Sequence, residues 1–452
     1  MQIFLFIIAI LLFAGLVLVH EGGHFLAARL SGVSVEEFGL GFPPRAWAKR
    51  LTSGMVLSLN WLPVGGFVKL KGEHDGDRSH GSFGSASLGA KTRILLAGVF
   101  ANLVAAVVIL TILALIGMPQ LITKNEFGQG QYSVKSDTHI SKQDVLAIYV
   151  EKNSPAARAG LSSLDKITSI DSGGRVIKTN TADKLKQATD EFAGETVRLN
   201  YTHNTKAESK TVKLRSKTDI TANLLKQAGL KSASQVTSIE VPGQKPRIYH
   251  INNSSDFLKT AQYLSGTPVL IKYKNAGQEL TKKVTLNAEG YLGVEPYQLT
   301  FTRSGWSAPI TAIGFTWQLI KLTVLGIGHA LAGLGSLIAG ATTGNSQARQ
   351  NGQAEATSQV GGPVIIVKIL WGAGLIGYQY MLAIIAVVSL SLAVFNVLPI
   401  PALDGGRLFM ILFSRLILRR PLSKLAEERA VATGMALLLA LVVLITIVDV
   451  RR

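Results

Sequence analysis

The sequence predicts an α-helical polytopic membrane protein with about four transmembrane helices, a membrane-associated β-hairpin and an inserted α+β region. Two observations support this fold class. The chain has 452 residues, of which 48% are hydrophobic and only 16% charged. Its hydrophobic residues gather toward the two ends, while the middle third has the composition of ordinary water-soluble protein. A membrane-embedded part interrupted by a water-exposed part accounts for both observations.

Four apolar runs are predicted to cross the bilayer. The first, 1–19, carries no charged side chain and continues as a helix to about Leu30, long enough to span a hydrocarbon core of ~30 Å. It has no basic n-region, so we expect it to be retained rather than cleaved as a signal peptide. The other runs are 94–118, 364–398 and 431–448. The run 309–341 is expected to be an interfacial or partly embedded helix, because four spans give a consistent charge topology and five do not.

Basic residues are concentrated in the loop between the first two spans and in the loop between the last two. These loops carry Arg29, Arg45, Lys49, Arg50, Lys69, Lys71, Arg78, Lys91 and Arg93, and Arg407, Arg415, Arg419, Arg420, Lys424 and Arg429. Both loops are therefore predicted to be cytoplasmic, which leaves the middle section and both termini on the other side. The net charge of +18 does not indicate nucleic-acid binding, because no Lys/Arg block is interleaved with aromatic residues.

The first of these loops contains a β-rich stretch, Met55–Lys71, with Leu-Pro-Val-Gly-Gly at its centre. Its alternating pattern predicts a hairpin. A hairpin near the membrane offers a free strand edge to which an extended peptide can add. The alternative, a hairpin that only packs against the rest of the protein, stays open on the sequence alone.

The middle section contains an internal repeat. The segments 159–171 and 228–240 share seven of thirteen positions, and the match resumes downstream, which predicts two tandem copies of one α+β module. The segment 153–161 (NSPAARAGL), followed by Asp165-Lys166-Ile167, resembles a bacterial PDZ domain, a fold that binds peptides by strand addition. The second copy keeps less of this pattern. The predicted regions are 1–118 for the first two helices with the hairpin at about 55–71, 125–218 and 219–300 for the two PDZ modules, 305–341 for the interfacial helix, 342–362 for a flexible loop, and 363–452 for the last two helices.

His20, Glu21 and His24 form an H-E-x-x-H pattern at the end of the first span. On a helix, residues i and i+4 share a face, so both imidazoles can reach one zinc ion while Glu21 stands beside it as the general base. The alternative is that these residues only mark the membrane boundary. Boundary positions are usually Lys, Arg, Trp or Tyr, and ionisable residues inside a span are costly and usually functional.

A catalytic zinc ion needs a third protein ligand, and the chain has no cysteine to supply it. Asp404, in the segment 396–406 (NVLPIPALDGG), is the best candidate, since it lies at the cytoplasmic end of the third span as the histidines do at the end of the first. The alternatives are that Asp404 caps a helix-ending turn and that His74 and His80 form a cluster with nearby aspartates. We expect those two histidines to lie in a solvated loop.

The H-E-x-x-H, the Gly-Gly-Phe-Val-Lys strand, the inserted PDZ modules and the N-x-x-P-x-x-x-L-D-G-G segment together resemble the site-2 proteases, in particular the bacterial regulator-of-sigma-E protease subfamily. The resemblance covers nearly the whole chain. It implies Zn²⁺ held by His20, His24 and Asp404, with Glu21 as catalytic base. It implies substrate binding by Asn396 and by the strand Gly65, Gly66, Phe67, Val68 and Lys69.

The same resemblance implies cleavage of membrane proteins with a single transmembrane helix after trimming by a site-1 protease. The substrates expected are anti-sigma factors or signal-peptide remnants, and the location expected is a bacterial inner membrane, with the PDZ modules outside the cytoplasm. Gly22-Gly23 stands where many members have bulkier residues. Two other hypotheses are a non-catalytic membrane scaffold, which would not need an intact base, and a transporter, which would need ionisable residues in several spans.

Overall fold

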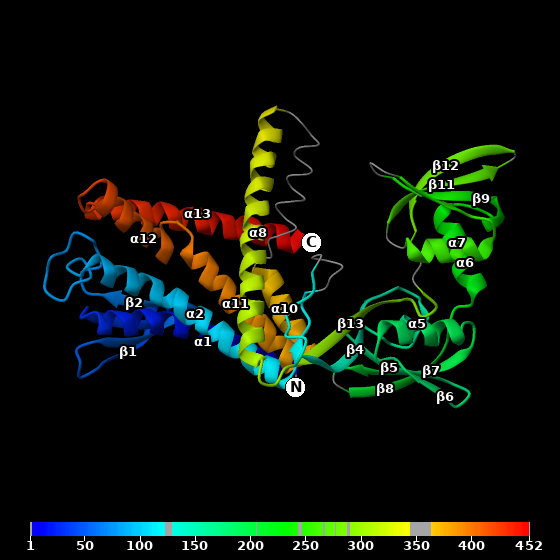
Figure 1. Cartoon of the computed structure of the whole chain (residues 1–452), viewed down its shortest axis with the longest axis horizontal. Helices are drawn as coiled ribbons and strands as arrows, with labels where there is room; N and C mark the ends of the chain where they lie inside the picture. Colours follow the sequence, from blue (N-terminus) through cyan, green and yellow to red (C-terminus); the bar gives the residue numbers. More distant parts are fainter. Residues whose placement is uncertain are drawn as a thin grey trace. The chain divides into compact units, whose positions relative to one another are not determined.

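The computed structural model describes residues 2–122, 129–204, 206–242, 246–264, 267–275, 277–286, 290–343 and 363–451. The predicted flexible loop lies outside the described residues from position 344 to 362. The chain divides into two compact units (Figure 1), one made of Met1–Ile140 with Thr302–Arg452 and the other of Ser141–Phe301. We call them the membrane unit and the soluble-type unit.

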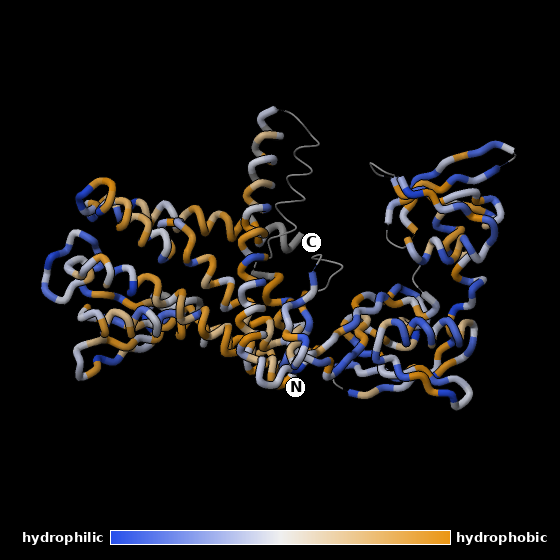
Figure 2. Tube along the Cα trace, viewed as in Figure 1, coloured by the Kyte–Doolittle hydropathy of each residue, from blue (hydrophilic) through white to orange (hydrophobic). Residues whose placement is uncertain are grey.

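Long apolar helices make up most of the membrane unit (Figure 2). Four segments are long and apolar enough to cross a membrane: Phe4–Leu30, Leu88–Ile116, Ala308–Leu337 and Tyr378–Val397. The helices are α1 (Gln2–Leu30), α2 (Leu88–Ile116), α8 (Ala308–Thr343), α10 (Pro363–Ile376), α11 (Tyr378–Val397), α12 (Asp404–Leu412) and α13 (Lys424–Arg451), with a π-helical turn, η2 (Phe413–Ile417), after α12. The number and composition of these helices are consistent with a polytopic membrane protein.

The helices differ from the predicted spans in three places. The run 364–398, predicted as one span, is divided at Gly377, whose φ of 141° interrupts the backbone between α10 and α11. The predicted span 431–448 lies within α13, which is not among the four segments that meet the length and composition criteria in the described residues. α8 meets those criteria, yet it runs across the direction of α1 and α2 (Figure 1). Its interfacial placement stays a prediction.

The β-structure of the membrane unit is more elaborate than the predicted hairpin. Strands β1 (Val35–Arg50) and β2 (Val56–Leu70) each bend into two arms. The arm 35–40 of β1 pairs with 66–70 of β2 and also with 56–59, while 45–50 pairs with 56–60. The two halves of the predicted hairpin 55–71 therefore do not pair with each other, because an arm of β1 lies between them. The alternating pattern predicted the strands correctly but assigned them the nearest partner in sequence.

The soluble-type unit contains two sheets built on the repeated sequence. In the first, β5 (Lys166–Ser172) pairs with β6 (Arg175–Lys178) and β7 (Thr196–His203), which pairs with β8 (Lys206–Lys213). In the second, β9 (Val236–Val241) pairs with β10 (Arg247–His250) and β11 (Pro268–Asn275), which pairs with β12 (Gln278–Thr285). Each copy carries one helix between its second and third strands, α5 (Ala182–Glu191) or α7 (Ser254–Tyr263). The same order and pairing in both copies confirm the internal repeat.

The two copies are not equal in extent. The first sheet also contains β4 (His139–Val150) beside β5, and β13 (Val294–Arg303) beside β4. Backbone contacts continue this pairing, since the Glu151 amide donates to the Gly293 carbonyl oxygen over 3.0 Å. The strand β13 follows the second copy in sequence but completes the first sheet. The second copy is inserted within the first.

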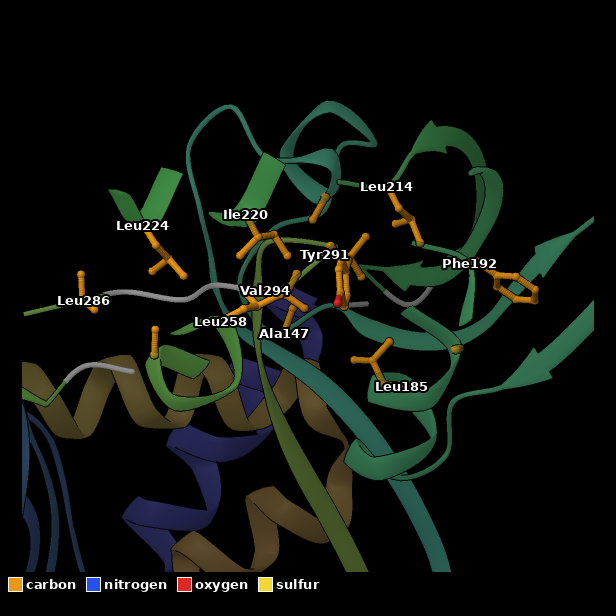
Figure 3. Packing of buried hydrophobic residues seen from close by; sticks show 14 of the residues in the cluster. Ala147, Leu185, Phe192, Leu214, Ile220, Leu224, Leu258, Leu286, Tyr291 and Val294 are labelled. Carbon is orange, nitrogen blue, oxygen red and sulfur yellow. The ribbon is translucent and has the colours of Figure 1, made fainter. Parts of the chain in front are cut away.

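One continuous apolar core fills the soluble-type unit (Figure 3). It joins residues of the first copy, such as Leu185 and Phe192, to residues of the second, such as Leu258. The helix α6 (Lys217–Ala228) connects the copies and contributes Ile220 and Leu224 to this core, and it begins with a capping box between Ser216 and Asp219. The smaller described elements are the helix α4 (Pro155–Arg158), the 3-10 turn η1 (Ala233–Gln235) and the two-residue strand β3 (Met118–Pro119).

Candidate metal centre

The helix α1 carries His20, Glu21 and His24 in one turn, as the pattern predicts. The segment is apolar and free of proline, so the helix continues unbroken through the three polar residues. His24 is 8% exposed and therefore buried. Both imidazoles point toward the same place because four residues make slightly more than one helical turn.

Asp404 reaches these imidazoles from the other end of the chain. α11 ends at Val397, and the chain turns through Pro399 and Pro401 before α12 begins at Asp404. The turn is tight enough to require glycine directly after the aspartate. A Cβ at Gly405 would collide with the carbonyl group of Val397, and a Cβ at Gly406 would collide with that of Ile400. The two glycines let the backbone fold back and place the carboxylate at the first turn of α12.

The three side chains converge on one point. The Nε2 atoms of His20 and His24 lie 3.1 and 3.2 Å from Oδ2 of Asp404, and 3.2 Å from each other. All three ligand atoms lie within 4.8 Å of one another. In a tetrahedral zinc site with bonds of about 2.0–2.1 Å, neighbouring ligand atoms are roughly 3.3 Å apart. The donor set and its spacing therefore fit a zinc ion that keeps a fourth position open.

A carboxylate beside two imidazoles is a donor set of catalytic zinc sites. Its negative charge favours a divalent cation at this centre.

The helix α2 contacts both histidines on the side away from Asp404, and none of the sequence motifs predicts these contacts. Nδ1 of His24 lies 2.7 Å from the carbonyl oxygen of Ile94, and Nδ1 of His20 lies 3.3 Å from Nδ2 of Asn102. Gly98 lies between these positions, and a Cβ there would come 2.7 Å from Cε1 of His20 and would also meet Nε2 of His24. The signal in the sequence was a lone asparagine in an apolar span, since such residues are usually functional.

The predicted substrate strand lies beside the glutamate. A Cβ at Gly66 would be 3.0 Å from Cγ of Glu21, so the backbone of β2 passes directly over this side chain. Gly66, Phe67, Val68 and Lys69 pair with Leu40, Gly39, Phe38 and Glu37 on one side, and the described residues place no strand on the other side. Gly65 precedes this arm with a φ of 86°. The sixth predicted substrate residue, Asn396, lies outside the strand and is half-buried in the last turn of α11.

A buried network of charges joins the elements around the centre. Asp75 is 1% exposed and contacts Nζ of Lys91 at the start of α2 and Nε of Arg415 in η2, at 2.5 and 2.8 Å. The Asp75 amide also donates to the carboxylate of Glu427 in α13 over 3.3 Å. This network ties the loop before α2 to the segment that follows Asp404. His74 lies near Glu427 and Glu428, and the described residues contain no potential metal cluster besides the one at His20.

Apolar helices around a His-His-Asp centre with an adjacent glutamate are typical of membrane metalloproteases. The comparison with protein families agrees, because the model of peptidase family M50 matches residues 8–441. The chain therefore belongs to peptidase family M50 and is a metalloprotease of the site-2 protease type.

Relatives match over nearly the full length of the chain. It is 29% identical to a provisionally named zinc metalloprotease of Clostridium perfringens, with 98% of each chain covered. It is 26% identical to the regulator of sigma-E protease RseP of Salmonella typhimurium and 25% identical to that of Escherichia coli K12, in both cases over 97% of this chain and 96% of the relative. These names confirm the predicted resemblance.

Proposed function

We propose that this chain is an intramembrane zinc metalloendopeptidase that hydrolyses peptide bonds within transmembrane segments of membrane proteins already trimmed by a site-1 protease. The observation that carries the proposal is the convergence of His20, His24 and Asp404 from opposite ends of the chain, at the spacing of a tetrahedral zinc site. In the proposal these three residues are the metal ligands. A bound zinc ion supplies Lewis acidity toward the scissile carbonyl and toward a water molecule.

Glu21 is the general base in this proposal. It follows the first ligand on the same helix, so it stands next to the centre, where it accepts the proton of the attacking water and later delivers it to the leaving amine. Burial of the centre among apolar helices excludes bulk water, which strengthens these electrostatic effects.

The strand arm Gly65–Lys69 is the proposed substrate platform. A transmembrane helix uses its own backbone amides internally, so it must be unwound before a protease can reach a peptide bond. The open edge of this arm lies over Glu21, where pairing with an extended segment delivers a carbonyl to the centre. Asn396, at the end of α11, is proposed to hold the unwound segment as well.

The sheet that carries this platform exposes large apolar side chains beside charged ones. The exposed apolar side chains include Trp47, Leu59 and Trp61, at 51%, 46% and 71%. Lys49 and Arg50 are exposed at the end of β1. A surface that combines tryptophan and leucine with basic residues supports the proposed association of this sheet with the membrane boundary.

The substrate class and the location follow the relatives. The substrates in the proposal are anti-sigma factors, which relatives named as regulators of sigma-E support, or signal-peptide remnants. We place the chain in a bacterial inner membrane with the centre near the cytoplasmic side and the soluble-type unit outside the cytoplasm. Its two modules are proposed to be PDZ domains that exclude untrimmed substrates or engage newly exposed C-termini.

Two measurements on the purified full-length protein test the proposal. The zinc content is expected to be one ion per chain in the wild type and to fall strongly in Asp404→Ala, while Glu428→Gln, a surface carboxylate variant, retains the ion. Cleavage of a single-span substrate is expected to be lost in Glu21→Gln with zinc retained. Full cleavage by Glu21→Gln would exclude the proposed base, and unchanged zinc in Asp404→Ala would exclude the third ligand.

A further inference from the structure

The Nδ1 atoms of the two imidazoles, which face away from Asp404, have different contacts on α2. Nδ1 of His24 faces the carbonyl oxygen of Ile94 at 2.7 Å, and a carbonyl can only accept a hydrogen bond. His24 must therefore carry its proton on Nδ1, which leaves the lone pair of Nε2 free for a cation. The backbone of α2 fixes this tautomer, and no side-chain substitution removes it.

For His20, the contact at Nδ1 comes from a side chain instead of the backbone. Its Nδ1 lies 3.3 Å from the side-chain amide of Asn102, which is 1% exposed. The amide nitrogen is placed toward the ring, and within the described residues the buried Oδ1 of Asn102 has no hydrogen-bond partner. The two ends of an amide have nearly the same shape, so their assignment follows from the hydrogen bonds they make.

Only one orientation of this amide is compatible with the centre. If Nδ2 donated to Nδ1, the ring proton would lie on Nε2, the atom that faces Asp404 at 3.1 Å, and His20 would have no lone pair to offer a cation there. With the amide turned, Oδ1 accepts a hydrogen bond from Nδ1–H at the same separation, and the lone pair of Nε2 is free to bind a cation.

We propose that Asn102 is a positioning residue whose side-chain oxygen accepts a hydrogen bond from Nδ1–H of His20 and so holds this imidazole as a metal ligand. This inference rests on the proposed zinc site. The helix α2 is well placed for the task, because the Oγ of Ser389 in α11 donates to the backbone oxygen of Asn102 over 2.9 Å. That bond fixes the helix at this residue, and the positions 94, 98 and 102 share one face of it toward both histidines.

The test compares two replacements of nearly equal size. Asn102→Asp keeps an oxygen that accepts from Nδ1–H, whereas Asn102→Leu removes the acceptor. Zinc affinity is measured by competition with a chelator on the full-length protein in detergent. We expect zinc to bind about 10–100-fold more weakly to Asn102→Leu, as for other residues that support metal ligands, and the affinity of Asn102→Asp to stay close to that of the wild type. When the proteins are loaded with Co²⁺, we expect the visible spectrum of Asn102→Asp to match that of the wild type and the spectrum of Asn102→Leu to differ from both.

Ser389→Ala is the matched control, since it removes the bond between α11 and α2 without touching His20. Zinc binding equal to wild type in Asn102→Leu, or an equal loss in Asn102→Leu and Ser389→Ala, would overturn the inference. Asn102→Ala also lacks the acceptor and is measured beside the leucine variant, so that poor folding of one of them does not decide the result. If Asp404→Ala loses zinc while Asn102→Leu retains it, the zinc site stands and only the role of Asn102 fails. If the wild type itself binds no zinc, the proposed function fails first.

Discussion

Both units bury apolar clusters, but the membrane unit also exposes many large apolar side chains along its helices and buries a network of charges. In the soluble-type unit the buried residues form one apolar core, exemplified by Leu199 at 0% exposure. In the membrane unit large apolar residues such as Leu437 are exposed, at 67%, while charged residues such as Asp75 and Lys91 are buried. Figure 2 shows that the helices of the membrane unit are largely hydrophobic along their length, whereas hydrophilic and hydrophobic residues are mixed in the soluble-type unit.

This difference follows from the surroundings of each unit. In water, burial of apolar surface drives folding, so the apolar side chains lie inside. In lipid, apolar surface gains nothing from burial, and helices are held by close packing and by internal polar contacts. The membrane unit is therefore expected to depend more strongly on its buried polar groups than the soluble-type unit does, and four predictions test this contrast.

The largest expected effect is that of Asp75→Ala. This change leaves the side chains of Lys91 and Arg415 without the carboxylate that they contact at 2.5 and 2.8 Å. Breaking a buried pair by removing one partner costs about 3–5 kcal/mol, and we expect that loss in the unfolding free energy of the membrane unit, measured by denaturation in detergent. Glu428→Gln is the control, because an exposed pair contributes about 0–1 kcal/mol. Equal effects of the two variants would contradict the contrast.

The second-largest expected loss of stability comes from a cavity in the soluble-type unit. Leu199→Ala removes a fully buried side chain from the apolar core and is expected to cost about 2–5 kcal/mol. Limited proteolysis of the full-length protein should show faster cleavage within 141–301. The matched control is Val176→Ala, since Val176 is 56% exposed. Unchanged proteolysis in Leu199→Ala would show that this core does not stabilise the unit.

A smaller effect is expected from a polar group in the same core. The hydroxyl of Tyr201 donates to the carbonyl oxygen of Ala159 over 2.7 Å, and burial together with the Glu208 carboxylate raises the pKa of this tyrosine to about 12. Because the folded pKa exceeds the unfolded value of about 10, the stabilisation is complete below pH ~10 and is lost as the pH rises through about 12.

We therefore expect Tyr201→Phe to cost about 1 kcal/mol at pH 8, and the gap from wild type to close above pH ~10. The measurement is denaturation of the full-length protein from pH 8 to 12. Tyr149→Phe, at an exposed tyrosine, controls for the loss of a phenol. A gap that stays constant with pH would contradict the raised pKa.

The smallest effect is expected at the apolar exterior of the membrane unit. Leu437→Ala shortens an exposed side chain of α13, and surface changes of this kind usually stay within about 0.5 kcal/mol. Denaturation in detergent compares this variant with Leu199→Ala, which makes the same chemical change in the other unit. A loss as large as that of Leu199→Ala would mean that Leu437 is buried against protein rather than lipid.

Several features of the fold and the site were predicted correctly from local sequence patterns. The spacing of His20 and His24 fixes a shared helix face in any helix that contains them. The first two spans follow from length and apolar composition, and the repeat in the middle section follows from identical positions. Each of these features depends on residues close together in sequence or on their composition, and so it needs no knowledge of the fold.

The pairing of strands that lie far apart in the sequence could not be predicted from these patterns. The alternation of 55–71 predicted strands, but the arm 35–40 of β1 separates their two halves. The strand β13 completes the first sheet although it follows the second copy. A period of two gives the faces of a strand and says nothing about which strand lies beside it.

The sequence by itself determined the class of the protein and its candidate ligands, because H-E-x-x-H and the L-D-G-G segment carry their chemistry in residue type and spacing. Only the tertiary structure decided that Asp404 meets both imidazoles at 3.1 and 3.2 Å, and that Asn102 lies behind His20. The physical reason is that α2 and α12 reach the centre by packing against helices far away in the chain. Such packing depends on the shapes of all the side chains between them, which no local pattern records.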